Sequence, residues 1–453
     1  MKRLSFFLTL AAACVAASAG RAQTNVNWTG GTGNWSNGAS WFNEATQGTG
    51  DLPSAAFNEI ARIDNGGVVT VNTAVQPPGE VRLGTVTGIG ELIIASGGAL
   101  DVQDAEDTDG GVEVGGPATG ILRVLPGGSL AVDGTIFSAA NVANLVQFGA
   151  ATGVGNATIA TGSASLGGTT VVHRNVAFSS TSTVALQGSS VYRPVISGAL
   201  HATLQAGGSI GLGGTLRPDF GGVAPTVGSA WNLLEGTSVS GAFSSVDPSL
   251  AGSLGGGQTF VVTTADAAAG RKTVRLSLRQ LAVLNVNRDT GVVTLANPGT
   301  TPVSFDGYTI ASTVAAINPA AWNSLQDQNA LGGTWRESPP DASRLSEIKR
   351  TGQGMLAGGQ SISLGAIFAP NPATFGALTE DLALQLASPD GVFNATVNYT
   401  GTKVNNLLLQ VDPSSGQARL RNPSNFTVQV DGYCADDQIA NVGFVQATKQ
   451  DLI

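Results

Sequence analysis

Apolar and polar residues alternate in short runs that end at paired glycines. The run GELIIASGGALDV at residues 90–102 returns thirty positions later as GILRVLPGGSLAV at residues 120–132, and weaker copies lie at residues 184–190 and 203–210. Alternation with a period of two is typical of a half-buried β-strand, and glycine at a corner accepts a positive φ. Repeats of this kind stack into solenoids. We therefore predict an all-β fold in which residues 23–278 form a glycine-rich β-solenoid that resembles a parallel β-helix.

A second repeat predicts a different module after residue 280. Residues 286–308 match residues 411–433 at a constant offset of 125 without a gap, including Asn-Pro at 297 and 422 and Asp-Gly-Tyr at 306 and 431. Each copy reads as strand, glycine turn, strand, Asn-Pro turn and strand, which is a meander typical of sandwich domains. We predict a β-sandwich module at residues 281–403 and a truncated second copy of it at residues 404–453.

The first copy has room to complete a sandwich, and the second does not. Asn318 and Pro319 predict a short helix with Asn318 as its N-cap, and further strands are expected near residues 361–368 and 392–399. Residues 434–453 match nothing in the first copy. A truncation or a shifted reading frame after Tyr433 would account for this mismatch.

The ends of a solenoid need a cap, because an open end exposes apolar surface and unpaired strand edges. Trp28, Trp35 and Trp41 lie close together at the start of the predicted solenoid and predict an N-terminal cap. Residues 228–278 read as regular strands that close the other end. The three tryptophans are also candidate ligand-binding residues, because an indole face can stack on the apolar patch of a sugar ring.

The first 22 residues predict an export signal. Lys2 and Arg3 precede an apolar run, and small residues lead to Ala22, after which we expect cleavage, with Ala19 as the second choice. The apolar run is too short for a permanent anchor, and no later segment approaches roughly 18 uninterrupted apolar residues, so we expect no membrane span after cleavage. The mature protein is expected to be secreted, in the extracellular space or on the cell surface of a bacterium.

Composition narrows the range of partners. Charged residues make up 12% of the chain, and removal of residues 1–22 leaves 19 basic residues against 31 acidic ones, a formal net charge of −12. Binding to nucleic acid depends on clustered Lys and Arg, so we exclude nucleic acid as a partner. Cys434 is the one cysteine left after cleavage, which excludes an intramolecular disulfide.

Several of these segments resemble known families. The tryptophan- and glycine-rich opening, DNGGVVTV at residues 64–71 and the Gly-Gly corners resemble the autotransporter-associated β-strand repeats of secreted bacterial proteins. LANPG at residues 295–299, Asp-Gly-Tyr at 306–308 and NPAAW at 318–322 are similar to modules of exported planctomycete-type surface proteins, some of which carry a C-terminal PEP-CTERM sorting signal. The resemblance covers most of the mature chain and implies a surface, matrix or adhesion component. This chain differs from the pattern in lacking a clear sorting helix and a basic tail.

One acidic segment is a candidate metal site. Asp104, Asp107 and Asp109 belong to DVQDAEDTDGG at residues 101–111, where alternate carboxylates beside a glycine turn suit the oxygen ligands that calcium prefers. A solvated acidic loop is the alternative interpretation. Asn285, Asn287 and Asp289 also resemble the ligands of a calcium loop. The second copy has Gln410, Asp412 and Ser414 at these positions, which favours a simple turn. Calcium apart, we expect no cofactor.

Candidate catalytic groups are few. His173 and His201 are the two histidines, and both lie in polar, strand-like repeats. GGSIG at residues 207–211 fits the nucleophile-elbow string, but that motif needs a strand-to-helix turn that this context does not offer. We predict an extracellular structural or adhesion protein without catalytic activity. A carbohydrate-binding surface protein is the first alternative, and a polysaccharide-degrading enzyme on a β-helix is the second. The expected partners are extracellular polysaccharide or other surface proteins.

Overall fold

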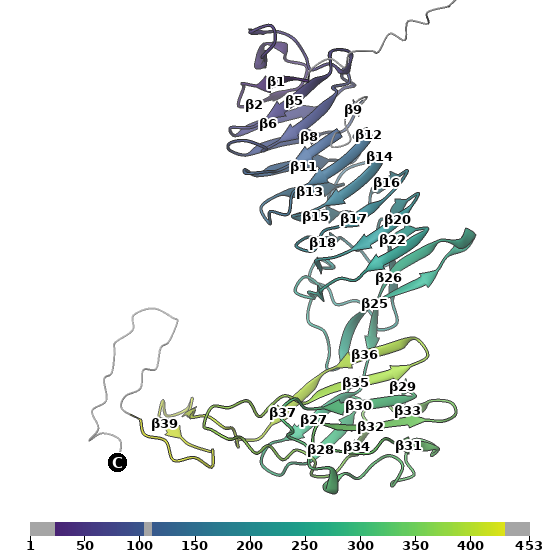
Figure 1. Ribbon diagram of the computed structural model, residues 1–453, viewed down its shortest axis with the longest axis vertical. Coiled ribbons are helices and arrows are strands. Elements are labelled where there is room, and N and C mark those ends of the chain that lie inside the picture. The colour runs from purple at the N-terminus through teal and green to yellow at the C-terminus, as the bar shows by residue number, and fades with distance from the viewer. Residues whose placement is uncertain (1–22, 104–110, 431–453) are drawn as a thin grey trace, which may run out of the picture. The chain divides into compact units, whose positions relative to one another are not determined.

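The structure is all-β, as predicted from the sequence. The computed structural model describes residues 23–103 and 111–430, with 47% strand and 3% helix (Figure 1). The predicted export signal, the candidate calcium residues Asp104, Asp107 and Asp109, and residues 431–453 lie outside the described residues. The chain divides into a first unit, Met1–Ser253 with Phe260–Leu278, and a second unit, Leu254–Thr259 with Arg279–Ile453.

Three ladders of parallel strands run through the described residues of the first unit (Figure 1), and we name them A, B and C. Ladder A contains β5 (Glu59–Ile63), β7 (Glu80–Leu83), β10 (Gly111–Val114), the second halves of β12 (Ser129–Ser138) and β14 (Ala157–Leu166), β17 (Val184–Leu186), β20 (Ser209–Leu212) and β23 (Ser238–Gly241). Ladder B contains β2 (Thr32–Asn34), β6 (Gly67–Val71), β8 (Gly90–Ile94), β11 (Gly120–Val124), β13 (Leu145–Phe148), β15 (Thr169–Val172), β18 (Val191–Pro194), β21 (Thr215–Leu216) and β24 (Ser245–Val246). Ladder C contains β9 (Ala99–Val102), the first halves of β12 and β14, β16 (Val176–Ser180), β19 (Leu204–Ala206) and β22 (Ala230–Gly236).

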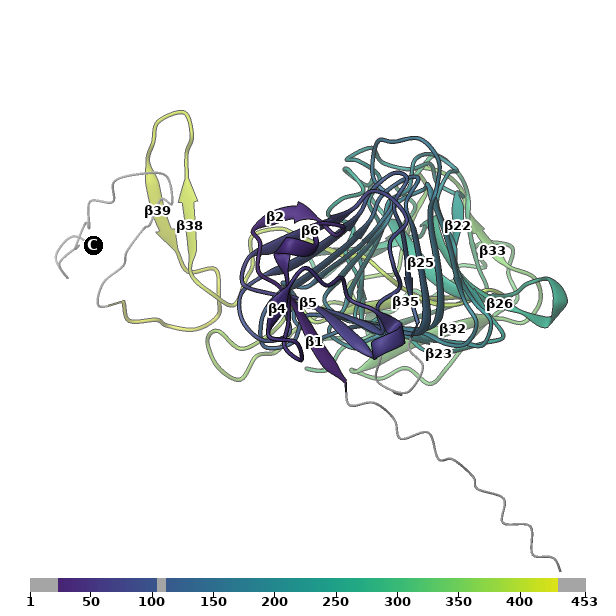
Figure 2. The same ribbon diagram turned by 90° about the horizontal axis from the view of Figure 1, so that it is seen from above.

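The chain visits the three ladders in a fixed cyclic order. From β7 onward it passes through a strand of ladder A, then one of ladder B, then one of ladder C, and returns to ladder A beside the strand that it left. We call one such passage through the three ladders a circuit. In Figure 2, which looks at the molecule from above, the strands of successive circuits overlie one another. Because every pairing within the ladders is parallel, each circuit hydrogen-bonds its backbone to the circuit before and the circuit after it.

Apolar side chains at matching positions of successive circuits form continuous columns. Along ladder C, one column holds six residues that are each at most 4% exposed: Leu100, Leu130, Ile159, Phe178, Leu204 and Leu234. Burying each such side chain contributes about 1.5–3 kcal/mol. In strands such as β8 and β11, the alternation seen in the sequence therefore separates buried residues from more exposed ones.

The first circuit differs from the rest because antiparallel strands cover it. β1 (Thr24–Trp28) pairs in parallel with β5 and antiparallel with β3 (Trp41–Asn43), and β3 turns back into β4 (Gly48–Thr49). The register of β1 and β3 places Trp28 opposite Trp41. At the other end, β22 pairs antiparallel with β26 (Lys272–Gln280), which follows β25 (Gln258–Asp266).

The second unit contains two main sheets. One has the order β34 (Ser361–Ser363), β28 (Val293–Ala296), β27 (Val283–Asn287) and β37 (Val397–Thr400), and the other β31 (Trp335–Glu337), β32 (Arg344–Lys349), β30 (Gly307–Ala311), β35 (Ala383–Ser388) and β36 (Gly391–Ala395). A further pair joins β29 (Val303–Phe305) to β33 (Gly354–Leu356). Buried residues of both sheets, such as Leu284, Leu295, Ile310 and Leu384, belong to one apolar cluster. The predicted helix is confirmed as a short 3-10 helix, Pro319–Ala321, in which the Asn318 side chain accepts from the backbone N–H of Ala320.

The duplicated sequence forms the same hairpin twice. β38 (Leu408–Val411) and β39 (Ala418–Arg421) pair antiparallel, as β27 and β28 do. The pairing follows the sequence offset of 125, since Leu284 pairs with Leu295 and Leu409 pairs with Leu420. The three strands predicted for the first copy are confirmed as β27, β28 and β29, but they do not form the predicted meander, because β29 pairs with β33 and the outer neighbour of β28 is β34.

The close stacking of circuits makes one glycine position testable. A Cβ added at Gly90 would lie 1.8 Å from the Ile63 carbonyl oxygen, whereas a Cβ added at Gly31 meets no atom within 4 Å. We expect Gly90→Ala to lower the free energy of unfolding by about 1–3 kcal/mol, because the circuits must move apart. The matched substitution Gly31→Ala should change it by less than about 0.5 kcal/mol. Scanning calorimetry on both variants measures the difference, and equal melting temperatures would refute the stacking.

Candidate functional site

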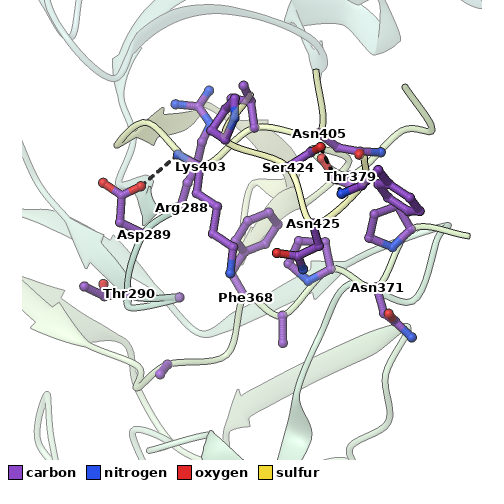
Figure 3. Close-up of a pocket in the computed structure, with 18 residues that line it drawn as sticks. Arg288, Asp289, Thr290, Phe368, Asn371, Thr379, Lys403, Asn405, Ser424 and Asn425 are labelled. Carbon is purple, nitrogen blue, oxygen red and sulfur yellow. Dashed lines mark hydrogen bonds between the residues drawn. The ribbon is translucent and has the colours of Figure 1, made fainter. Parts of the chain in front are cut away.

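The second unit contains a cavity of about 570 Å³ (Figure 3). Its wall comes from segments that are far apart in the sequence: the β27–β28 turn, a segment within residues 366–372, Thr379 and two stretches on either side of the β38–β39 hairpin. The lining residues are Arg288, Asp289, Thr290, Gly291, Ala366, Phe368, Ala369, Pro370, Asn371, Pro372, Thr379, Lys403, Val404, Asn405, Pro423, Ser424, Asn425 and Phe426. A cavity of this size can accept a small molecule or one to two sugar units.

Arg288 is held rigidly at one side of the cavity. Its Nε and Nη2 atoms donate to the two carboxylate oxygens of Glu380 at 2.7 and 2.8 Å, and its guanidinium carbon lies 5.3 Å from the centre of the Tyr399 ring. The hydrogen bonds from Arg288 to Glu380, together with the charge of that carboxylate, raise the pKa of Arg288. A guanidinium that is paired and stacked in this way fixes the geometry of the wall.

Asp289 ties the β27–β28 turn to the chain that follows β37. Its Oδ1 accepts from the backbone N–H groups of Thr402 and Lys403 at 2.9 and 2.8 Å (Figure 3). These two donors hold the pKa of Asp289 below its usual range. Asn287 caps the same turn, because its Oδ1 accepts from the backbone N–H groups of Asp289 and Thr290. The Oδ1 atoms of Asn287 and Asp289 thus accept hydrogen bonds from the protein backbone, which favours the turn interpretation of residues 285–289.

The remaining rim combines amides, hydroxyls and one ammonium group over an apolar floor. Asn371, Asn425 and Lys403 are exposed, and the Phe368 ring is buried beneath them. Asn405 is anchored, because its Nδ2 donates to the carbonyl oxygens of Thr374 and Ala377 at 2.9 and 3.0 Å. Such a rim can both donate to and accept from a hydroxyl-rich ligand, while the floor offers apolar contact.

The predicted tryptophan residues lie in the interior of the first circuit. Trp28, Trp35 and Trp41 are 5%, 0% and 0% exposed, and Trp41 makes edge-to-face contacts with both of the others at 5.1 and 4.9 Å. The Nε1 of Trp28 donates to the Gly31 carbonyl and that of Trp41 to the Trp35 carbonyl. This burial argues against the predicted stacking on sugar, because a ring that stacks on a sugar must present a face to solvent. It agrees with the interpretation of the three rings as packing at the start of the parallel ladders.

The other sequence candidates also lie in strand surroundings. Gly207 and Gly208 separate β19 from β20, and Ser209 begins a strand, so the strand-to-helix turn of a nucleophile elbow does not form. His173 is partly buried, and burial lowers its pKa. A ring nitrogen of His201 lies 2.8 Å from the Asn232 carbonyl oxygen.

A buried carboxylate in the second unit was missed by the sequence analysis. Glu347 is 2% exposed, and its Oε2 accepts from the Tyr308 hydroxyl at 2.5 Å and from the Leu325 N–H at 2.8 Å. Its Oε1 accepts from the Gln326 N–H at 2.8 Å. The alternation of residues in β32 could have predicted the burial of Glu347, since Glu347 lies on the same face of the strand as the buried Leu345. Tyr308, from the repeated Asp-Gly-Tyr motif, is itself a core residue at 2% exposure.

Comparisons with known proteins add no family to this description. No family model, no curated protein and no solved structure matches the chain. Among residues 23–103 and 111–430, no group of three or more His, Cys, Asp or Glu residues is placed to hold a metal ion. The same residues include no helix that is long and apolar enough to cross a membrane.

The buried Glu347 predicts a specific pH dependence of stability. Burial raises its pKa above 4.5, so the folded state holds this proton more tightly than the unfolded state. The free energy of unfolding should therefore fall as pH rises from about 4.5 through the raised pKa, because the folded protein must ionise a buried acid. Glu347→Gln should flatten this part of the pH profile, whereas Asp327→Asn, at an exposed position of the same unit, should keep the wild-type slope. Urea unfolding between pH 4.5 and about 7 measures both, and identical slopes for wild type and Glu347→Gln would contradict the assignment.

Proposed function

We propose that this chain is an extracellular structural or adhesion protein in which a β-solenoid presents β-sandwich modules. The observation that carries this proposal is the cyclic order of ladders A, B and C, since a chain that returns to each ladder once per circuit forms stacked coils. The apolar columns would be the solenoid interior and the three ladders its faces. The single apolar cluster shared by the two main sheets of the second unit supports a sandwich there.

Side chains that join successive circuits support a role as a rigid scaffold. Arg123 on β11 donates to Glu91 on the preceding strand of ladder B and to Gln147 on the following one. Arg217 pairs with Asp247, one circuit later, at 2.7 Å. Surface pairs of this type contribute little individually, but along a ladder they hold neighbouring coils in register. Such a stack offers extended polar faces for contact with a partner. The expected secretion rests on the predicted export signal.

A second candidate function is carbohydrate binding in the cavity of the second unit. The specific observation is its rim of Asn371, Asn425 and Lys403 above a buried aromatic floor. This location replaces the tryptophan cluster of the first unit as the candidate site. Both candidate functions are binding functions, and the proposal includes no catalytic step.

Deletion of one whole circuit tests the solenoid. Gly90 pairs with Gly120 in ladder B, so removing residues 91–120 should bring Ile121 into the place of Glu91 and leave every later strand in phase. We expect this variant to fold and to unfold cooperatively, because each coil contacts only its neighbours. Removing residues 91–105 instead breaks the phase and should prevent folding of the coils that follow. Circular dichroism and thermal unfolding compare the two, and loss of structure in the in-phase deletion would refute the solenoid.

Retention on immobilised polysaccharides tests the binding function. Cellulose, chitin, pectin and alginate serve as probes for the purified mature protein, with the released sugars analysed for new reducing ends and unsaturated products. We expect retention on at least one probe and no released product.

If the cavity carries the binding, Asn425→Ala should weaken retention by about tenfold, since a lost hydrogen bond costs about 1–1.5 kcal/mol. Thr427→Ala, at an exposed position outside the cavity lining, should not. Release of a defined sugar product would overturn the proposal in favour of a degrading enzyme.

A further inference from the structure

A second cavity, of about 410 Å³, lies in the first unit. Its wall lies within residues 27–30, 62–65 and 86–87, at the carboxyl ends of β1 and β5 and in the turns that follow β1, β5 and β7. These three strands run parallel and side by side, so their carboxyl ends meet at one edge. Gln23, where the described chain begins, lies at the opposite edge, where its side chain donates to Glu80 at the start of β7.

Hydrogen bonds hold the turns around this cavity in place. The Asn65 N–H donates to the Thr87 carbonyl at 2.8 Å, and the Thr87 hydroxyl donates to the Asn65 Oδ1 at 2.6 Å. The Thr29 N–H donates to the Ser40 carbonyl at 2.8 Å. A wall that is ordered before a ligand arrives lowers the entropic cost of binding.

Two charged side chains of the wall have buried polar atoms without a protein partner. Asp64 is 7% exposed, and its Oδ1 accepts from the Val86 N–H at a long 3.4 Å. Its Oδ2 and the Nε of Arg62 are buried, and neither atom meets a hydrogen-bond partner among the residues that the structure describes. Buried polar groups in folded proteins are nearly always hydrogen-bonded. A ligand that donates to Asp64 and accepts from Arg62 would complete both groups.

The opposite charges of Arg62 and Asp64 restrict the chemistry of such a ligand. A simple cation would be attracted by the carboxylate and repelled by the guanidinium, and a simple anion would meet the reverse. A hydroxyl group both donates and accepts, so neighbouring hydroxyls of one neutral molecule can serve both side chains. Asn27 and Asn65 add amide groups to the wall, and Val86, which is 49% exposed, adds apolar contact.

The charge beside the cavity disfavours acidic ligands. Glu44 is exposed, and its Oε1 accepts from the Nδ2 of Asn27 at 2.7 Å. Arg82, which lies next to Arg62 in ladder A, is paired with Glu80 at 2.7 Å. Glu44 therefore adds a negative charge to a wall whose own two charges cancel. The carboxylate of a uronic acid would be repelled by it.

We infer that this cavity binds one neutral hexose unit, whose hydroxyls accept from Arg62 and donate to Asp64. Trp28 lines the cavity but is only 5% exposed, so the sugar is held by hydrogen bonds and not by stacking on an indole face. The volume suits a single sugar unit. The site is separate from the cavity of the second unit, and it goes beyond the proposed structural function, which does not require it.

Saturation-transfer NMR on the full mature chain tests the inference with glucose, galactose and mannose as neutral probes and with glucuronic and galacturonic acids as acidic ones. We expect at least one neutral hexose to bind with a Kd of roughly 0.1–10 mM, because few hydrogen bonds hold it. The acids should bind at least about fivefold more weakly, because like charges repel.

Two variants locate the site. Arg62→Ala removes a charged donor and should weaken binding by at least about tenfold. Val86→Arg changes an exposed residue of the wall and should abolish binding, because the new guanidinium reaches into the cavity and pairs with Asp64. Arg275→Ala, at an exposed position of β26 outside the cavity, is the matched control and should bind as wild type does. Circular dichroism checks the fold, and Val86→Arg decides alone if Arg62→Ala loses strand content.

Three outcomes would overturn the inference. No binding of a neutral hexose at about 50 mM would mean that solvent alone meets Arg62 and Asp64. Tighter binding of the uronic acids would make this an anion site. Wild-type binding in both Arg62→Ala and Val86→Arg would place the sugar elsewhere. If Asn425→Ala then abolished that binding, it would belong to the cavity of the second unit, which would leave the carbohydrate function proposed there intact.

Discussion

Parallel backbone pairing between successive circuits is the interaction on which the first unit depends. Each strand of ladder B between β6 and β21 has a parallel neighbour on both sides, so its amide and carbonyl groups are used on both edges. The pairing fixes the register, and the register aligns Leu92 with Leu122 and Leu122 with Val146 in the interior. Close stacking leaves no space for a side chain at Gly90. The columns, the corner glycines and the bridging side chain of Arg123 all follow from this one arrangement.

The sequence predicted elements well where a local pattern determines them. The echo between residues 90–102 and 120–132 gave β8, β9, β11 and the first half of β12 with their pairing, because period-two alternation and glycine corners are local signals. The cyclic order of three ladders was not evident, since paired residues are separated by variable lengths. Gly90 pairs with Gly120, but Thr169 pairs with Val191. Loops of different length can leave a ladder unchanged, so no fixed period appears in the sequence.

The candidate site was much less predictable than the strands. The offset of 125 revealed the hairpin whose turn contains Arg288 and Asp289, but not that Glu380 and Thr402 would bind these residues. The tryptophan cluster was visible in the sequence, whereas its burial depends on the antiparallel pairing of β1 with β3. Glu347 likewise becomes a buried acid only when Tyr308, Leu325 and Gln326 surround it. In each case a contact between distant segments decides the chemistry, and a single sequence carries little record of such contacts.

Amide hydrogen exchange gives the sharpest test of the parallel pairing between ladder strands. If the ladders pair as described, the backbone amides of Gly120–Val124 in β11, which has a strand on each side, should exchange orders of magnitude more slowly than those of an unstructured peptide. Exposed segments between the ladders, such as residues 151–156, should exchange quickly in the same sample. Exchange of Gly120–Val124 at the rate of an unstructured peptide would contradict the stacked ladders and the scaffold function proposed from them.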